Sequence, residues 1–291
     1  MKNLDQKPQT VIAVQGTKLY YSEALPQQTL SPGMYRIETV RVGGEYLPAF
    51  QPLDVSNDAP LDIDSKVTEI VNEIDDFFGR QAVFHKMGFS HKRGYMLHGP
   101  PGCGKSSTLR LLERHFVDKF EGIVLFWGPG INISGYVEHI RSHEANRPIF
   151  VVCEDIDNSI SYFEEEILEF LDGQKALNNF VLVATTNNLA AIPSRIKDRP
   201  SRIDRVLEIG LPGTETRYKY LRQVGVTESQ ARLLAEGTPG LSIAHLKEII
   251  VATVCLGRPL DEVLKRLKVA DMRPFDVTID GDDDGDDPEE G

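Results

Sequence analysis

The stretch that decides the fold is Tyr95-Met96-Leu97-His98-Gly99-Pro100-Pro101-Gly102-Cys103-Gly104-Lys105-Ser106-Ser107. It begins as an apolar, strand-like run, continues as a glycine-rich turn and leads into a helix-like segment at residues 109–116. Residues 99–106 fit the pattern G-x-x-x-x-G-K-[ST], in which glycines let successive backbone N–H groups converge on phosphate oxygens. The start of the following helix adds partial positive charge. The sequence therefore predicts a phosphate-binding loop between a strand and a helix.

The residues of this loop are candidate ligands for a nucleoside triphosphate. Lys105 is expected to reach the β- and γ-phosphates, and the Ser106 hydroxyl is expected to bind Mg²⁺. A nucleoside triphosphate and Mg²⁺ are thus the predicted ligands, and the family resemblance given below implies that the nucleotide is ATP. The predicted nucleotide-binding set in this stretch is Gly99, Pro100, Pro101, Gly102, Cys103, Gly104, Lys105, Ser106 and Ser107.

Around the loop, short continuous apolar runs alternate with helix-like stretches. Runs that polar residues do not interrupt are typical of parallel strands covered on both faces. They lie at residues 95–97, 122–127, 149–153, 180–184 and 206–209. The pattern predicts an α/β fold with a doubly wound, parallel, five-stranded sheet within residues 61–212, whose first helix starts near Asp64 or Ser65.

The regions on either side of this sheet differ from it in composition. Residues 1–60 are rich in Pro, Gln, Gly and aromatic residues and contain short β-like runs, which predicts a small β-rich amino-terminal module. Residues 213–270 carry helical patterns only, which predicts a small helical lid. Residues 271–291 form an acidic tail with little to bury, which predicts disorder.

Charge and cysteine content narrow the class of protein. The chain has 291 residues and a formal net charge of −12, but nine of its 44 acids lie after residue 275. The rest has 35 acids against 32 Lys and Arg, and this near neutrality argues against a nucleic-acid partner. Three cysteines without C-x-x-C spacing favour a reducing compartment. No secretory-type amino terminus and no membrane-length apolar run are found, so a cytoplasmic protein is expected.

Acidic and amide side chains follow two of the predicted strands. Glu154 and Asp155 come directly after the run at 149–153, and Asn187 follows the run at 180–184. Ligands of open α/β sheets bind at the carboxyl ends of the strands. One acid is therefore expected to hold Mg²⁺ and the other to polarise the attacking water. The Asn187 amide is expected to orient that water against the γ-phosphate.

Arg199 and Arg202 lie three residues apart, shortly before the last predicted strand. Two guanidinium groups at this spacing can meet a phosphate that a neighbouring subunit supplies. They can equally pair with acids of their own chain. The sequence alone leaves both alternatives open.

Taken in this order, the signatures resemble those of the AAA family within the AAA+ group of P-loop ATPases, over residues 64–268. The resemblance implies that Glu154 and Asp155 are the Walker B acids and that Asn187 is the sensor 1 residue. It implies that Arg199 and Arg202 are arginine fingers. Because the segment before them is longer than usual, Arg195 remains a further candidate. Residues 240–246 look like the family's lid segment, which contacts adenine and places Ala244 in the nucleotide site.

The order of the two acids departs from the family pattern, which usually has Asp before Glu. By position, Asp155 is assigned the water-activating role and Glu154 the metal, although the shorter side chain of Asp155 leaves the roles exchangeable. Residues 93–107 and 154–157 look most like the ATPase domain of the AAA translocase type that exports the folded Rieske iron–sulfur protein from mitochondria. The transmembrane helix of that type is not found in this sequence.

The resemblance implies an ATPase that hydrolyses ATP with Mg²⁺ at the subunit interfaces of a ring of six or seven copies. Hydrolysis is expected to drive the remodelling or translocation of a protein client that residues 1–60 select. Two alternatives stay open: a nucleic-acid-linked ATPase of the loader type, and an ATP-gated scaffold with little hydrolysis. Residues 126–128 are expected to pack in the core, so threading past an aromatic loop is not expected.

Overall fold

The computed structural model describes residues 11–15, 18–22, 29–42, 45–53, 65–158, 160–172, 178–199, 202–269 and 275–280. The chain divides into two compact units, each of which is described by itself. The first takes in residues 1–60, 68–98 and 109–208, and the second takes in residues 61–67, 99–108 and 209–291. Asp64 as a helix start and the end of the acidic tail, residues 281–291, lie outside the described residues.

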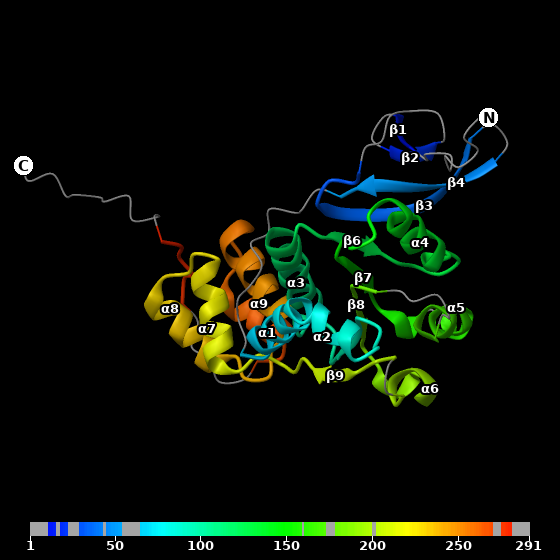
Figure 1. Cartoon of the computed structure of the whole chain (residues 1–291). Helices are drawn as coiled ribbons and strands as arrows, with labels where there is room; N and C mark the ends of the chain where they lie inside the picture. The colour runs from blue at the N-terminus through cyan, green and yellow to red at the C-terminus, as the bar shows by residue number, and fades with distance from the viewer. Residues whose placement is uncertain are drawn as a thin grey trace, which may run out of the picture. The chain divides into compact units, whose positions relative to one another are not determined.

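A nine-stranded sheet organises the first unit (Figure 1), in the order β1-β2-β4-β3-β6-β7-β8-β5-β9. Neighbours among its last five strands pair in parallel. These are the strands that the apolar runs predict: β5 (Lys92–His98), β6 (Ile123–Phe126), β7 (Ile149–Cys153), β8 (Phe180–Thr186) and β9 (Arg205–Glu208). The parallel-dominated α/β architecture is therefore confirmed.

The sheet is wider than the five strands expected, because amino-terminal strands join it. β3 (Gly33–Val42) pairs in parallel with β6, from Gly33 opposite Ile123 to Arg36 opposite Phe126. The other three strands pair antiparallel: β1 (Val11–Gln15), β2 (Lys18–Ser22) and β4 (Glu45–Pro52). The physical reason is that an uncovered β6 would present a row of unpaired backbone N–H and C=O groups, which β3 satisfies.

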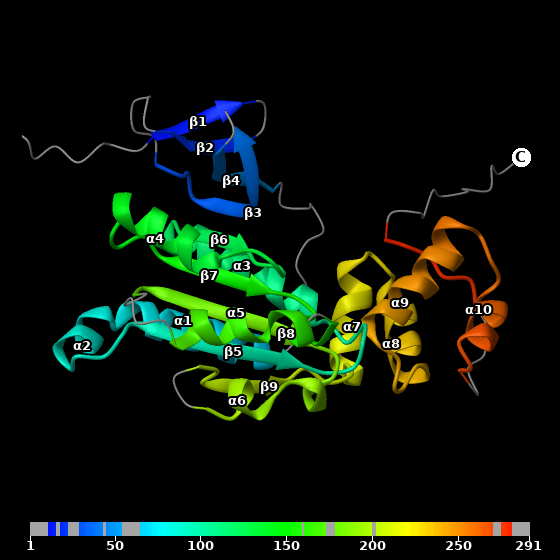
Figure 2. The same ribbon diagram turned by 90° about the vertical axis from the view of Figure 1, so that its right-hand side faces the viewer.

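Helices cover both faces of the parallel strands in the first unit (Figures 1 and 2). On one side lie α1 (Ser65–Gly79), α2 (Gln81–Lys86) and α3 (Lys105–Phe120), and on the other lie α4 (Ile133–His143), α5 (Ile160–Asp172) and α6 (Ser194–Lys197). Strand β7 serves both layers. Its Val151 belongs to the core beneath α4 and α5, while the Phe150 ring lies 5.3 Å from that of Phe116 on α3. This double coverage explains why the run is apolar at every position.

The second unit is helical, as its sequence pattern predicts. It contains α7 (Thr214–Gln223), α8 (Glu228–Gly237), α9 (Ile243–Ile250), a π-helical turn (Val251–Cys255) and α10 (Leu260–Arg266). Its core includes buried leucines from these helices: Leu221, Leu234, Leu246, Leu260 and Leu264. Among the described residues, no helix is long and apolar enough to cross a bilayer.

Part of the segment assigned to the acidic tail is packed onto this unit. Ile279 forms an antiparallel bridge with Val226, and Asp280 pairs with Arg222 at 2.7 Å. Phe275 and Val277 pack against the helical core. The expectation of a tail from residue 271 placed its start too early, because these apolar side chains have surface to bury whereas residues 281–291 have none.

Candidate active site

The glycine-rich loop leaves β5 at His98 and enters α3 at Lys105, as the sequence predicts. Gly102 and Gly104 have φ values of +75° and +110°, a conformation that L side chains rarely adopt. At Gly102 a Cβ atom would lie only 2.9 Å from the Ala244 Cβ and from the Ser242 Oγ. Glycine is therefore required at this point of the loop.

The Lys105 ammonium group is held within the loop. Its Nζ donates to the carbonyl oxygens of Gly99 at 2.8 Å and Pro100 at 3.0 Å, and it lies 3.9 Å from the Cys103 Sγ. Ser106 and Ser107 occupy the first turn of α3. A buried cation at the start of a helix, next to glycines that free the backbone N–H groups, is an arrangement that binds phosphate.

A cavity adjoins the loop within the second unit. Its walls combine apolar side chains with a few hydroxyl groups. It is lined by Val67, Cys103, Gly104, Ser107, Thr108, Ile209, Gly210, Pro212, Thr216 and Ile243. Ile243 belongs to the lid segment at residues 240–246, but the sequence did not single out Val67, Thr108 or the lining residues at 209–216, because no motif connects them to the loop.

The first turn of α9 lies against the loop. The Ala244 N–H donates to the Gly102 carbonyl at 3.4 Å, and Ser242 caps the helix through a reciprocal pair of hydrogen bonds with His245. Ala244, the predicted adenine contact, thus touches the backbone of the loop. Its neighbour Ile243 lines the cavity and is the stronger candidate for contact with a base.

In the first unit, an acid and an amide meet beyond the carboxyl ends of β7 and β8. The Asn187 Nδ2 donates to the Asp155 Oδ1 at 3.1 Å, and the Asn187 N–H donates to the Asp157 Oδ1 at 3.3 Å. The Asp155 N–H donates to the Thr185 Oγ1 at 2.9 Å. Glu154 and Asp155 are both exposed, so each is accessible to solvent and to a ligand. Thr185 and Asp157 were not among the predicted site residues.

Glu113, on α3, is a further acid that the sequence did not single out. It is only 2% exposed. Burial and then the nearby charge of Glu154 raise its pKa from 4.5 to about 8, against the opposing effect of Arg110. Near neutral pH the Glu113 carboxyl is therefore mostly protonated, which keeps a second negative charge away from Glu154.

Replacing Glu113 with glutamine is expected to flatten the dependence of stability on pH. Because the folded-state pKa of about 8 lies above 4.5, the folded chain binds this proton more tightly than the unfolded chain. The resulting stability is complete below pH 4.5 and is lost as the pH rises through about 8. In the wild type this group should lower the free energy of unfolding by up to about 1.4 kcal/mol per pH unit in that window.

Urea unfolding at pH 5, 6, 7 and 8 measures this slope. Glu169→Gln, on an exposed position of α5, is the matched control and should keep the wild-type slope. Equal slopes for Glu113→Gln and the wild type would show that Glu113 does not hold its proton in the folded chain.

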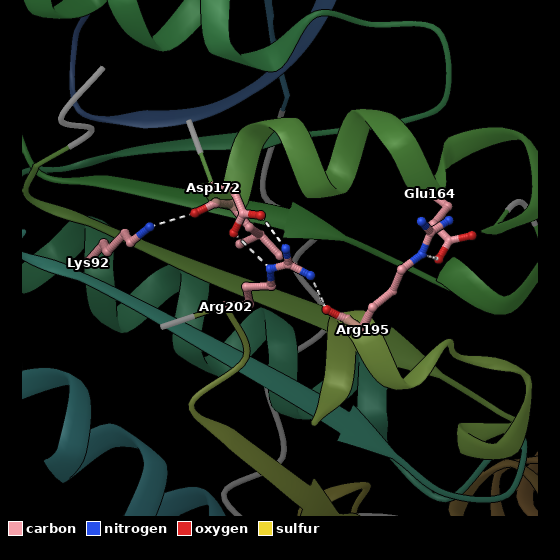
Figure 3. A network of polar contacts seen from close by, with 6 residues as sticks. Lys92, Glu164, Asp172, Arg195 and Arg202 are labelled. Carbon is pink, nitrogen blue, oxygen red and sulfur yellow. Dashed lines mark hydrogen bonds and ion pairs between the residues drawn. The ribbon is translucent and has the colours of Figure 1, made fainter. Parts of the chain in front are cut away.

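Two of the three candidate arginines are bound to acids of α5 (Figure 3). Arg202 is 6% exposed; its Nε donates to the Asp172 Oδ1 at 2.7 Å, and its other nitrogens reach the Asp172 Oδ2 and the Arg195 carbonyl. The Arg195 side chain is more than half exposed and pairs with Glu164. The hydrogen bond from Arg202 holds the pKa of Asp172 below its usual range. Of the two alternatives for Arg202, the structure therefore shows the local ion pair, whereas Arg199 is exposed.

The aromatic residue that could imitate a threading loop is buried. Trp127 is 5% exposed, its Nε1 donates to the Ile131 carbonyl at 2.9 Å, and its ring lies 5.0 Å from that of Phe170. The expected core packing of Trp127 is confirmed.

The residues that carry these groups match a known family. Residues 95–211 match the model described as "ATPase family associated with various cellular activities (AAA)". The proteasome-activating nucleotidase of Thermococcus onnurineus is 25% identical, with 64% of this chain and 52% of the relative covered. The cell division cycle protein 48 homolog of Archaeoglobus fulgidus is 27% identical, with 62% and 28% covered. The ATPase family gene 2 protein of Saccharomyces cerevisiae is 29% identical, with 68% and 28% covered.

This chain matches about half of the length of the nucleotidase and less of the other two relatives. The matched family segment contains the phosphate-binding loop, both acids, Asn187 and the arginines. Residues 95–211 are therefore similar to the ATPase domain of the AAA family.

Proposed function

We propose that this protein hydrolyses ATP at interfaces between its own copies and uses the energy to remodel or translocate a protein client. The observation that carries the proposal is the contact between Asp155 and Asn187 beyond β7 and β8, inside the same family match as the phosphate-binding loop. An acid held by an amide at the carboxyl ends of parallel strands is suited to activating a water molecule.

The loop residues fit a triphosphate and a magnesium ion. Gly102 and Gly104 adopt the left-handed backbone conformation that lets loop N–H groups converge on phosphate, and Lys105 brings a buried positive charge to the start of α3. The Ser106 hydroxyl and the Glu154 carboxylate are oxygen donors of the kind that Mg²⁺ prefers. When bound, Mg²⁺ neutralises charge on the phosphates. Ile243 and the other cavity residues are proposed to hold adenine.

In this proposal Asp155 accepts a proton from the attacking water, and Asn187 keeps the Asp155 carboxylate in place. Lys105 stabilises the negative charge of the phosphate oxygens during in-line attack. Glu154 holds the metal. Because the acids stand in an unusual order, an exchange of roles between Glu154 and Asp155 is the alternative that mutagenesis has to test.

The arginines are proposed to divide their work. Arg199, which is exposed, acts on the nucleotide of an adjacent copy, while Arg202 holds the arginine segment to α5 through Asp172. Action in trans supports a ring in which each copy completes its neighbour's site, and the resemblance to the AAA family implies six or seven copies. The name of one relative, proteasome-activating nucleotidase, agrees with a protein client.

The finer assignments belong to the same proposal. Residues 1–60 are proposed to select the client, and the chain is proposed to work in the cytoplasm. The order Glu154-Asp155, together with residues 93–107, supports an ATPase domain of the Rieske-protein translocase type.

The specific ATPase activity is expected to rise steeply with protein concentration, because a single copy lacks its neighbour's arginine. Such an arginine contributes roughly 10³ to 10⁵ in rate, so the dilute protein should be nearly inactive. Turnover across a dilution series, paired with light scattering with and without ATP, measures this.

A rate per copy that does not change on dilution, in a protein that stays monomeric, would contradict an interfacial site. Tight ATP binding without turnover in the assembled protein would favour the scaffold. Turnover that DNA stimulates and salt suppresses would favour the loader.

A further inference from the structure

We propose that Thr185 is a positioning residue for hydrolysis: its hydroxyl holds the Asp155 backbone in a left-handed turn that aims the carboxylate at Asn187. The inference rests on the proposed function, because it takes Asp155 as the acid that activates water. It adds a residue that no motif in the sequence marks.

The turn at Asp155 is unusual for a residue with a side chain. Its φ is +47°, in the left-handed region that aspartate tolerates better than most residues but still adopts rarely. It lies between the end of β7 and the 3₁₀ turn Ile156–Asn158, and its carbonyl accepts a hydrogen bond from the Asn158 N–H at 3.0 Å. A rare backbone conformation of this kind persists when its surroundings enforce it.

Thr185 supplies one of these constraints. Its Oγ1 accepts the hydrogen bond of the Asp155 N–H at 2.9 Å, and the residue is 1% exposed within β8. Because threonine is branched at Cβ, its hydroxyl has few rotamers and stays aimed at the turn. Without that hydroxyl, the Asp155 N–H would lose its hydrogen-bond acceptor on β8.

The second constraint acts on the carboxylate itself. Asn187 lies two residues after Thr185, so both approach Asp155 from the same end of β8, one at its backbone and the other at its side chain. The Asn187 N–H is in turn bound to Asp157. Asp155 is thus fixed at two points, and loss of either is expected to let the carboxylate move away from the productive position.

Thr185→Val tests the inference, because valine has the same shape but cannot accept a hydrogen bond. In the assembled full chain we expect kcat to fall by about tenfold to a hundredfold, the effect of a misplaced catalytic group, with KM for ATP changed by less than about twofold. Thr185→Ser keeps the hydroxyl and should restore most of kcat. This split between kcat and KM, with rescue by serine, would not follow from a general loss of stability.

Thr186→Val is the matched control. Thr186 is the next residue of β8, is equally buried, and accepts the Asn188 N–H at 3.0 Å instead of that of Asp155. Its valine variant should lose comparable thermal stability with a smaller loss of kcat. If Thr185→Val does not fold, Thr185→Ser and Thr185→Ala still separate the hydroxyl from the methyl group, and only the alanine variant should lose kcat.

Comparison with Asp155→Asn separates the positioning role of Thr185 from the water-activating role of Asp155. If Asp155→Asn abolishes turnover and Thr185→Val leaves kcat unchanged, the positioning role of Thr185 is wrong and the proposed function stands. If Asp155→Asn turns over ATP like the wild type, the assignment of the acid is wrong, whatever Thr185→Val does. If both single variants are impaired, Thr185→Val should cause no further loss in the Asp155→Asn background.

Discussion

Arg199→Ala is expected to lower ATP turnover of the assembled protein by about 10³-fold or more while ATP affinity stays nearly unchanged. The reason lies in how the arginine segment is held. Arg195 and Arg202 are both engaged by acids of α5, through Glu164 and Asp172, whereas Arg199 between them is exposed. Steady-state turnover and equilibrium binding of a labelled ATP analogue measure the two quantities.

Arg202→Ala should behave differently. Removing the buried guanidinium leaves the Arg195 carbonyl and Asp172 without this partner, which should cost about 1–3 kcal/mol of stability as well as turnover. Arg199→Ala, by contrast, should leave the thermal midpoint unchanged. A wild-type rate in Arg199→Ala, with a lost rate in Arg202→Ala at unchanged stability, would instead make Arg202 the finger.

A mixing experiment tests whether Arg199 acts on another copy. Copies with Arg199→Ala keep the loop but lack the arginine, and copies with Lys105→Ala lack the phosphate contact but keep the arginine. Each alone should be inactive. Mixed assemblies contain interfaces with an intact loop on one side and an intact Arg199 on the other, so activity should reappear. No recovery in mixed assemblies confirmed by mass would argue against action in trans.

Asp155→Asn should lower turnover by about 10²- to 10⁴-fold and leave ATP bound but uncleaved. Asparagine keeps the shape of the side chain, tolerates a φ of +47° and can still accept the hydrogen bond from Asn187. The variant therefore removes the base and disturbs little else. Retention of radiolabelled ATP on the assembled protein after gel filtration measures the trapped state.

Glu154→Gln is the companion variant. If Glu154 holds the metal, this change should weaken Mg²⁺-dependent ATP binding instead of trapping ATP. Trapped ATP in Glu154→Gln, together with turnover in Asp155→Asn, would show that the two acids exchange the roles given to them here.

Local patterns in the sequence were enough to locate the phosphate-binding loop and the parallel strands. The spacing of Gly99, Gly104 and Lys105 identifies the loop. This is possible because phosphate binding there depends on the backbone N–H groups of consecutive residues. The unbroken apolar run at residues 149–153 predicts β7, because a strand that is covered on both faces is apolar at every position. Both signals lie within a few residues of chain.

Features that depend on distant partners could not be predicted in this way. The role of Arg202 depends on its ion pair with Asp172, which lies 30 residues earlier. The local sequence around Arg202 is compatible with either this ion pair or an arginine finger. The raised pKa of Glu113 arises from burial, which a single glutamate in a helical pattern does not reveal. Thr185 stands in an apolar strand, and only the folded chain brings its hydroxyl to the Asp155 N–H.

The parallel pairing of β3 with β6 has a consequence for any shortened version of the protein. Deleting residues 1–60 would remove the four residue pairs between β3 and β6 and expose the hydrogen-bonding edge of β6 to solvent. An exposed strand edge of this kind can pair with strands of other molecules. The truncated protein is therefore expected to aggregate through β6. Lost activity after such a deletion would then report self-association of the ATPase core, and not the absence of a client receptor.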